Sequence, residues 1–315
     1  MTVTEIDGPP LRKRRRRHPQ RPPYEAEPGP FALGAKTIAL VLIVLAVLVP
    51  LWTVIITSLS TQEAITRAGG LVLLPSDLTV QAYRDIIAGG VVTRAVGVSV
   101  FVTGIGTMLS VVVAILTSYG LSRRGSLLHR PILFMLLITM FFGAGMIPTY
   151  LLVAGLGLID SLWALILPTA VSAFNILIMR NFFMNIDQGI LDSARIDGAS
   201  EWRTLSQIVI PLSRAVIAVV ALFYGVAYWN AFFNAVLYIN DSTKWPLQLV
   251  LRSYVLQGRA VPGTTFDPST LDGGETASLA IQMAVVVLAM VPVLIVYPFV
   301  QRHFSSGVMI GAIKG

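Results

Sequence analysis

Six apolar stretches, each long enough to cross a lipid bilayer as a helix, dominate the sequence. About 20 apolar residues suffice to span the hydrocarbon core of a membrane in helical form. Such stretches occupy residues 37–59, 95–121, 131–153, 163–183, 215–239 and 278–300. Because 55% of the residues are hydrophobic and only 12% are charged, the composition is also typical of a membrane protein. The sequence therefore predicts an all-α, polytopic membrane protein with six transmembrane helices.

The basic residues predict how these helices are oriented. With six spans, both chain termini lie on the same side of the membrane. Placing the termini inside leaves few of the 23 Lys and Arg residues outside, namely Arg67, Arg84, Arg94, Lys244, Arg252 and Arg259. Since basic residues concentrate in cytoplasmic segments, we expect an N-in, C-in topology.

Residues 1–36 precede the first apolar stretch. They contain the run LRKRRRRHPQR and seven prolines, a composition that favours disorder. We expect a disordered basic cytoplasmic tail whose arginines fix the topology and contact anionic membrane lipid. A cleaved signal peptide and a nucleic-acid-binding segment are the alternatives; the apolar stretch is too long for the first, and a basic run in a membrane protein favours lipid over the second.

The apolar stretches lack the charged side chains of ion-coupled carriers, and the chain lacks clear nucleotide-binding and hydrolase motifs. Their central parts contain no Asp, Glu, Lys, Arg or His, and such groups serve ion-coupled carriers and proton pumps. The segment GPFALGAKT departs from the phosphate-loop pattern, and no hydrolase motif occurs. Cysteine is absent and the three histidines are far apart. We therefore expect no enzyme activity, no metal and no cofactor in this chain, and an energy source on another chain.

The polar stretch LDSARIDGASEWRTLSQIVIPL, residues 191–212, separates the fourth and fifth apolar stretches. Asp187 is suited to begin a short helix, and Asp197-Gly198 to end it. Ser200 is suited to begin a second helix, which Pro211 would end. The pattern predicts a compact cytoplasmic loop over residues 185–213 that fits a groove in a partner protein.

This stretch closely resembles the EAA loop of binding-protein-dependent ABC importer permeases. Asp192, Ser193 and Ala194 stand at the Glu-Ala-Ala positions of that motif, Gly198 at its glycine, and Ile208, Ile210 and Pro211 at its closing segment. The segments FFGAGMIPTYLLVAGLGLIDSLWALILP, ALFYGVAYWNAFFNAVLYI, WPLQLVLR and SSGVMIGAIKG resemble the carbohydrate-uptake (maltose-type) branch of these permeases, which includes importers of oligosaccharides and uronate-containing sugars. Asp192 in place of Glu and Ser193 in place of Ala depart from the motif, and we expect them to shorten one contact to the ATPase.

The resemblance implies a type I ABC importer permease over residues 37–315, in the bacterial plasma membrane. It implies a second homologous permease, two ABC ATPase subunits that bind ATP and Mg, and an extracellular solute-binding protein as partners, with no nucleic acid. The residues expected to couple the chain to the ATPase are Asp192, Ser193, Ala194, Arg195, Asp197, Gly198, Ala199, Trp202 and Pro211. An ion-coupled secondary sugar carrier is the alternative function.

One face of the fifth apolar stretch is a candidate solute path. Phe223, Ala227, Asn230 and Asn234 lie at helical spacing, and Tyr224 and Tyr228 lie beside them. Aromatic rings and amides are groups that bind sugars, so Tyr224, Tyr228, Asn230 and Asn234 are the candidate residues. Hydrogen bonding between helices of the bundle is the alternative role.

Residues 246–257 form a further amphipathic segment. Leu247, Val250, Leu251 and Tyr254 share one helical face, flanked by Arg252 and Arg259. The segment either receives the solute-binding protein at the outer surface or packs on the bundle as a lid.

Overall fold

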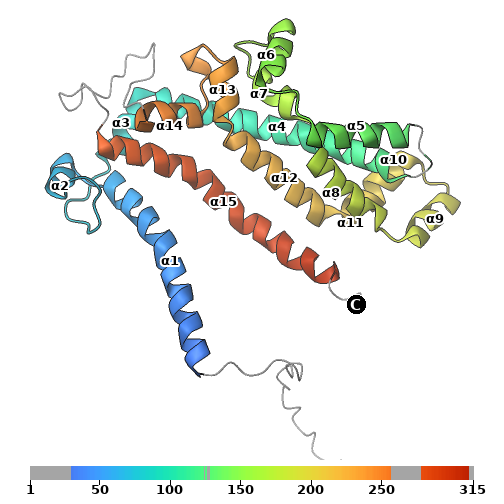
Figure 1. The fold of residues 1–315 in the computed structure, drawn as a ribbon, viewed down its shortest axis with the longest axis horizontal. Helices are drawn as coiled ribbons and strands as arrows, with labels where there is room; N and C mark the ends of the chain where they lie inside the picture. Colours follow the sequence, from blue (N-terminus) through green and yellow to red (C-terminus); the bar gives the residue numbers. More distant parts are fainter. Residues whose placement is uncertain (1–29, 124, 126–127, 257–277, 312–315) are drawn as a thin grey trace, which may run out of the picture. The chain divides into compact units, whose positions relative to one another are not determined.

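The computed structural model describes residues 30–123, 125, 128–256 and 278–311. The side chains of 254–256 and 299–311 are not described, so the first 29 residues of the predicted tail, the side chain of Tyr254 and Arg259 lie outside the described part. The regular elements of the described residues are all helical, with one isolated bridge between Ser60 and Leu78 (Figure 1). The predicted all-α class is confirmed.

The helices follow the apolar stretches but are more numerous than six. Those before residue 160 are α1 (Pro30–Ser58), α2 (Gln62–Arg67), α3 (Gln81–Gly89), α4 (Val91–Ser122), α5 (His129–Phe141) and α6 (Met146–Gly155). Those after it are α7 (Trp163–Ile166), η1 (Leu167–Thr169), α8 (Ala173–Met184), α9 (Gln188–Ile196), α10 (Glu201–Thr204), η2 (Leu205–Val209), α11 (Ile210–Leu212), α12 (Arg214–Trp229), α13 (Phe232–Tyr238), η3 (Ser242–Lys244), α14 (Leu247–Leu256) and α15 (Leu279–Gly311). Two compact units divide the chain, residues 1–50 and 51–315. The description below concerns the second unit.

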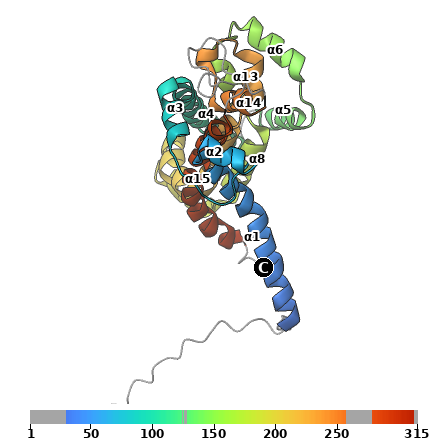
Figure 2. The ribbon, with the colours of Figure 1, turned by 90° about the vertical axis from the view of Figure 1, so that its left-hand side faces the viewer.

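Three of the expected spans, 131–153, 163–183 and 215–239, are not single straight helices; in the last of them α12 ends at Trp229 and α13 begins at Phe232. Helices α1, α4 and α15 are long and apolar enough to cross a membrane, and the described residues reach six spans when each bent pair counts as one. The pair α5–α6 bends by 119° and the pair α7–α8 by 51°, so unbroken helices over 131–153 and 163–183 are wrong. Gly145, with φ +87°, permits the first bend, because only glycine adopts such φ freely. Figure 2 shows α6 turning away from α5.

Helix α4 is the central element of the second unit. It packs against α12 and α8 through a stripe of small buried residues, Gly106, Ser110, Ala114 and Ser118. A Cβ atom on Gly106 would lie 2.9 Å from ring atoms of Tyr228. Small residues of this kind let membrane helices approach closely, so the stripe explains why α4 sits in the core.

Two tyrosine hydroxyls form hydrogen bonds with the backbone near the bend between α7 and α8. Tyr228 donates to the Ile166 carbonyl (3.1 Å) and also bonds the Ser110 hydroxyl (2.8 Å). The Tyr224 hydroxyl accepts from the Ser172 backbone N–H at 3.1 Å. Polar backbone groups freed by a broken membrane helix need partners. The tyrosines supply them from α12.

Helix α14 lies at the opposite end of α4 from residues 185–213. Leu247 and Val250 are fully buried, and α14 packs against α4 and α15. The Ser99 hydroxyl accepts from the Leu247 backbone N–H at 2.8 Å. The structure therefore shows this segment packed on the bundle, and its contact with the solute-binding protein stays a prediction. Arg252 lies over the Phe232 ring, with its guanidinium carbon 5.4 Å from the ring centroid.

Candidate functional site: the loop between α8 and α12

The loop of residues 185–213 begins each of its two helices as the sequence predicts. The Asp187 carboxylate accepts from the Gly189 N–H (2.7 Å) at the start of α9. The Ser200 hydroxyl accepts from the Arg203 N–H (3.3 Å) at the start of α10. Such side-chain oxygens satisfy N–H groups that a first helical turn leaves free. Both predicted helix starts are confirmed.

The turn between the two helices depends on Gly198. The Ala199 N–H donates to the Ala194 carbonyl (2.9 Å), and the Gly198 N–H donates to the Arg195 carbonyl (3.0 Å). These two bonds, with Gly198 at φ +74°, form a Schellman motif at the end of α9. No atom lies within 4 Å of the position a Cβ on Gly198 would take. Glycine is therefore required here for its backbone conformation and not for lack of space.

The end of the second helix differs from the prediction. Helix α10 continues through the π-helical turn η2 into α11, and the chain bends by 82° between the segments Glu201–Leu212 and Arg214–Trp229. Pro211 lies inside α11, so the prediction that it ends the helix is wrong. The π-helical turn η2, which is wider than an α-helical turn, lies directly before α11. The break falls at Ser213.

The loop presents both apolar and charged groups to its surroundings. Ile196 is 87% exposed and Trp202 is 70% exposed, whereas Leu191, Ala194, Leu205 and Val209 are buried. Asp192 and Arg195 form an exposed ion pair at 3.1 Å. Of the expected coupling residues, Asp192, Ser193, Arg195, Asp197, Gly198 and Trp202 are exposed, Ala199 and Pro211 are half-buried, and Ala194 is buried. Large exposed apolar side chains beside charges are the chemistry of a surface that docks into a protein groove.

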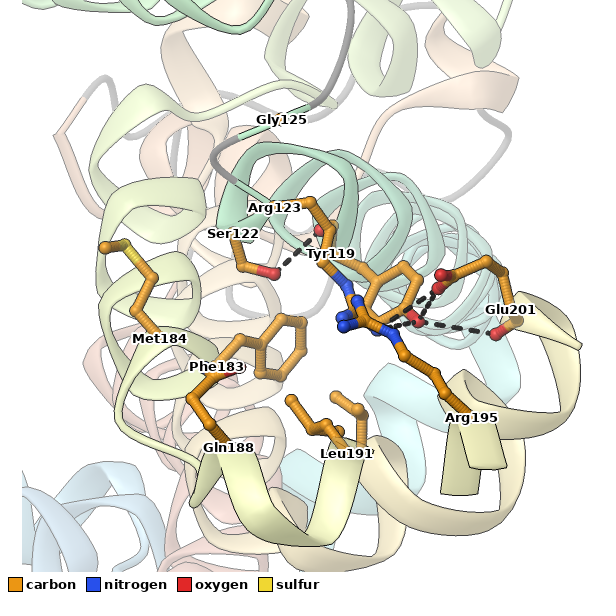
Figure 3. A pocket seen from close by; sticks show the side chains of 11 residues that line it. Tyr119, Ser122, Arg123, Gly125, Phe183, Met184, Gln188, Leu191, Arg195 and Glu201 are labelled. Carbon is orange, nitrogen blue, oxygen red and sulfur yellow. Dashed lines mark hydrogen bonds and ion pairs between the residues drawn. The ribbon is translucent and has the colours of Figure 1, made fainter. Parts of the chain in front are cut away.

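A cavity of about 720 Å³ lies between the loop and the end of α4 (Figure 3). Tyr119, Arg123 and Glu201 meet in its wall. Arg123 donates to the Tyr119 hydroxyl (2.7 Å) and pairs with the Glu201 carboxylate (3.1 Å), and Tyr119 donates to the same carboxylate. The sequence pattern does not indicate this cluster, because Glu201 is far from the other two residues in the chain.

The candidate solute residues do not form one face of one helix. Helix α12 ends at Trp229, Asn230 caps it by donating to the Val226 carbonyl (2.9 Å), and Asn234 belongs to α13. The expectation of a single face is therefore wrong. Tyr224 and Tyr228 are buried, and their hydroxyls bond other helices of this chain, which is the alternative role. Asn230 is exposed and Asn234 is half-buried.

No group of three or more His, Asp or Glu residues that could hold a metal ion occurs in the part of the chain that the structure describes.

The second unit combines helices that are apolar enough to span a membrane with an exposed two-helix loop. The family of the inner membrane components of binding-protein-dependent transport systems matches residues 106–310, and the chain belongs to this family. It is 43% identical over 276 residues to the polygalacturonan/rhamnogalacturonan transport system permease protein YtcP of Bacillus subtilis (strain 168), covering 88% of this chain and 96% of that protein. It is 27% identical to the arabinooligosaccharides transport system permease protein AraQ of Halalkalibacterium halodurans, covering 91% and 98% of the two chains.

A solved structure shares the fold. The chain superposes on a subunit of a bacterial ABC transporter involved in the import of the acidic polysaccharide alginate, with a TM-score of 0.81 and 28% identity. The match covers 90% of this chain and 100% of that one. Together these similarities favour an ABC permease of the inner membrane over an ion-coupled carrier.

Proposed function

We propose that this chain is a permease subunit of an ATP-driven carbohydrate importer. It forms the translocation path with a second homologous permease, and two separate ATPase subunits bind ATP and Mg. An extracellular solute-binding protein delivers the solute, and this chain holds no cofactor itself. The observation that carries the proposal is the exposed loop of residues 185–213, whose Schellman turn places glycine at the motif position.

The proposed solutes are oligosaccharides that contain uronic acids. One similar protein is named for polygalacturonan/rhamnogalacturonan transport, and the similar solved structure is of a transporter involved in the import of the acidic polysaccharide alginate. Uptake of a labelled oligogalacturonate into vesicles that contain the whole transporter tests this proposal. We expect uptake to need ATP and to continue when an uncoupler collapses the ion gradient. Uptake that an uncoupler abolishes while ATP is held constant would instead show an ion-coupled carrier.

The proposed orientation is N-in, C-in, with the loop of residues 185–213 in the cytoplasm. It rests on the distribution of basic residues. We expect a cysteine at the exposed Gly125 to react with an impermeant thiol reagent only from the cytoplasm, and one at Leu74, which is 81% exposed, only from outside. The wild-type chain contains no cysteine, so it is the negative control for both variants. The opposite pattern of labelling would reject this orientation.

Asn230 is the exposed member of the proposed solute path. Its amide oxygen accepts from Gln248 at 3.5 Å, so the two amides lie together where α12 ends. We expect Asn230→Ala to raise the apparent KM for uptake severalfold, because a lost hydrogen bond to solute weakens binding by about 0.5–1.5 kcal/mol. Uptake kinetics in vesicles, normalised to the amount of assembled transporter, give the result. An unchanged KM with less assembled transporter would assign Asn230 to helix packing.

A further inference from the structure

The cytoplasmic loop is tied to helix α4 by three side chains that bond one another. Tyr119 and Arg123 lie at the end of α4, and Glu201 lies in the first turn of α10 (Figure 3). Arg123 lies over the Tyr119 ring at 5.0 Å and bonds both the Tyr119 hydroxyl and the Glu201 carboxylate. The Arg123 side chain is 20% exposed and the Glu201 side chain is 62% exposed. An isolated exposed ion pair holds two elements weakly, whereas here the hydroxyl, the guanidinium and the carboxylate each bond the other two.

This cluster differs from the other ion pair of the loop. Asp192 and Arg195 are three residues apart on α9, so their contact holds nothing outside that helix. Among the described residues, the pair Arg123–Glu201 is the one ion pair that joins the loop to a spanning helix. A displacement of α10 therefore acts directly on the end of α4.

Helix α4 extends from this cluster to the opposite end of the bundle without a break. Its 32 residues correspond to about 48 Å of helix. Along its length, the Ser118 hydroxyl donates to the Ile176 carbonyl of α8 (2.9 Å), Ser110 bonds Tyr228, and Ser99 accepts from the Leu247 N–H of α14. Tyr228 in turn holds the Ile166 carbonyl at the bend between α7 and α8. One continuous helix thus contacts the loop, the bent span and the helix at the far end.

We propose that Tyr119, Arg123 and Glu201 form a clamp that transmits movement of the cytoplasmic loop into α4. A continuous helix is stiff, so α4 carries this movement to the α7–α8 bend and to α14. In this role the three residues are positioning residues, which act through the loop and α4. This inference rests on the proposed function, in which the loop docks on the ATPase.

Glu201→Ala and Tyr119→Phe test the clamp in the complete transporter with its ATPase and solute-binding protein. Both changes remove clamp contacts and leave the exposed docking residues Ile196 and Trp202 in place. We expect normal recruitment of the ATPase and continued ATP hydrolysis. Solute taken up per ATP hydrolysed should fall about fivefold or more, the size of a typical coupling between sites.

Two control variants test whether the loss of uptake per ATP is specific to the contact between Arg123 and Glu201. Asp77→Ala removes the partner of Arg67 in another ion pair (2.5 Å), outside α4 and the loop, and should leave uptake per ATP unchanged. The double variant Arg123→Glu with Glu201→Arg restores opposite charges across the same gap and should recover part of the lost coupling.

Two outcomes would overturn the proposal. One is a Glu201→Ala transporter with unchanged uptake per ATP. The other is a loss of uptake in proportion to a loss of bound ATPase, which would make the cluster a support for the loop alone. The Gly198→Val variant tests the proposed docking of the loop separately, because it reports on how much ATPase binds. The clamp variants are compared only in complexes that have bound the full amount of ATPase.

Discussion

A Gly198→Val permease should insert into the membrane and pair with its partner, yet recruit the ATPase poorly or fail to couple hydrolysis to uptake. Gly198 adopts φ +74° in the Schellman turn between α9 and α10. A β-branched residue is strained there by about 1–3 kcal/mol, although no neighbouring atom blocks its Cβ. Because the loop lies outside the spanning helices, it relieves the strain by changing the angle between its two helices. We expect recruitment to fall about fivefold to a hundredfold, since about 1.4 kcal/mol corresponds to a factor of ten.

Gly198→Asn is the matched control for this prediction. Asparagine tolerates the left-handed backbone region better than other non-glycine residues, so it should keep most of the recruitment that valine loses. Asp192→Ala should give a milder defect than Gly198→Val, because the Asp192–Arg195 pair is exposed and such pairs contribute little. Co-purification of the ATPase, together with uptake and hydrolysis rates, measures all three variants. A Gly198→Val complex with full recruitment and undiminished uptake would show that the stretch is only a connector.

The loop could be predicted from the sequence because its signals act over a few residues. Asp187 and Ser200 cap the helices that directly follow them, and Gly198 ends the helix directly before it. Each of these residues acts on a helical turn directly beside it in the sequence. The apolar stretches were predictable for a similar reason, since span length depends on local composition.

The bends and the clamp could not be predicted in this way because they depend on distant residues. The break between α7 and α8 relies on Tyr224 and Tyr228 of α12 to bond its free backbone groups. The clamp joins Tyr119 to Glu201, 82 positions later. The candidate solute face failed because helical spacing was extended past Trp229, where α12 ends. Periodicity identifies a face only when the helix is continuous.

Gly106→Leu should prevent the second unit from packing, with the largest loss of stability among the changes considered. A Cβ at this position would lie 2.9 Å from two ring carbons of Tyr228. That ring is buried, and its hydroxyl is held by both Ser110 and Ile166, so it cannot move aside without breaking these bonds. Even Gly106→Ala should cost about 1–3 kcal/mol, as is usual when a packed core is overfilled. The melting temperature and the monodisperse yield of the detergent-solubilised permease measure both variants.

Gly104→Ala supplies the matched control, because Gly104 lies on the same helix two residues earlier and no atom lies within 4 Å of its Cβ position. Alanine is favoured over glycine inside a helix by about 0.5–1 kcal/mol, so this variant should melt at or slightly above the wild-type temperature. Tyr228→Ala, combined with Gly106→Leu, opens the space that leucine needs and should recover part of the yield. A Gly106→Ala permease that melts with the wild type would show that α4 and α12 tolerate a wider separation than the contact between Gly106 and Tyr228 implies.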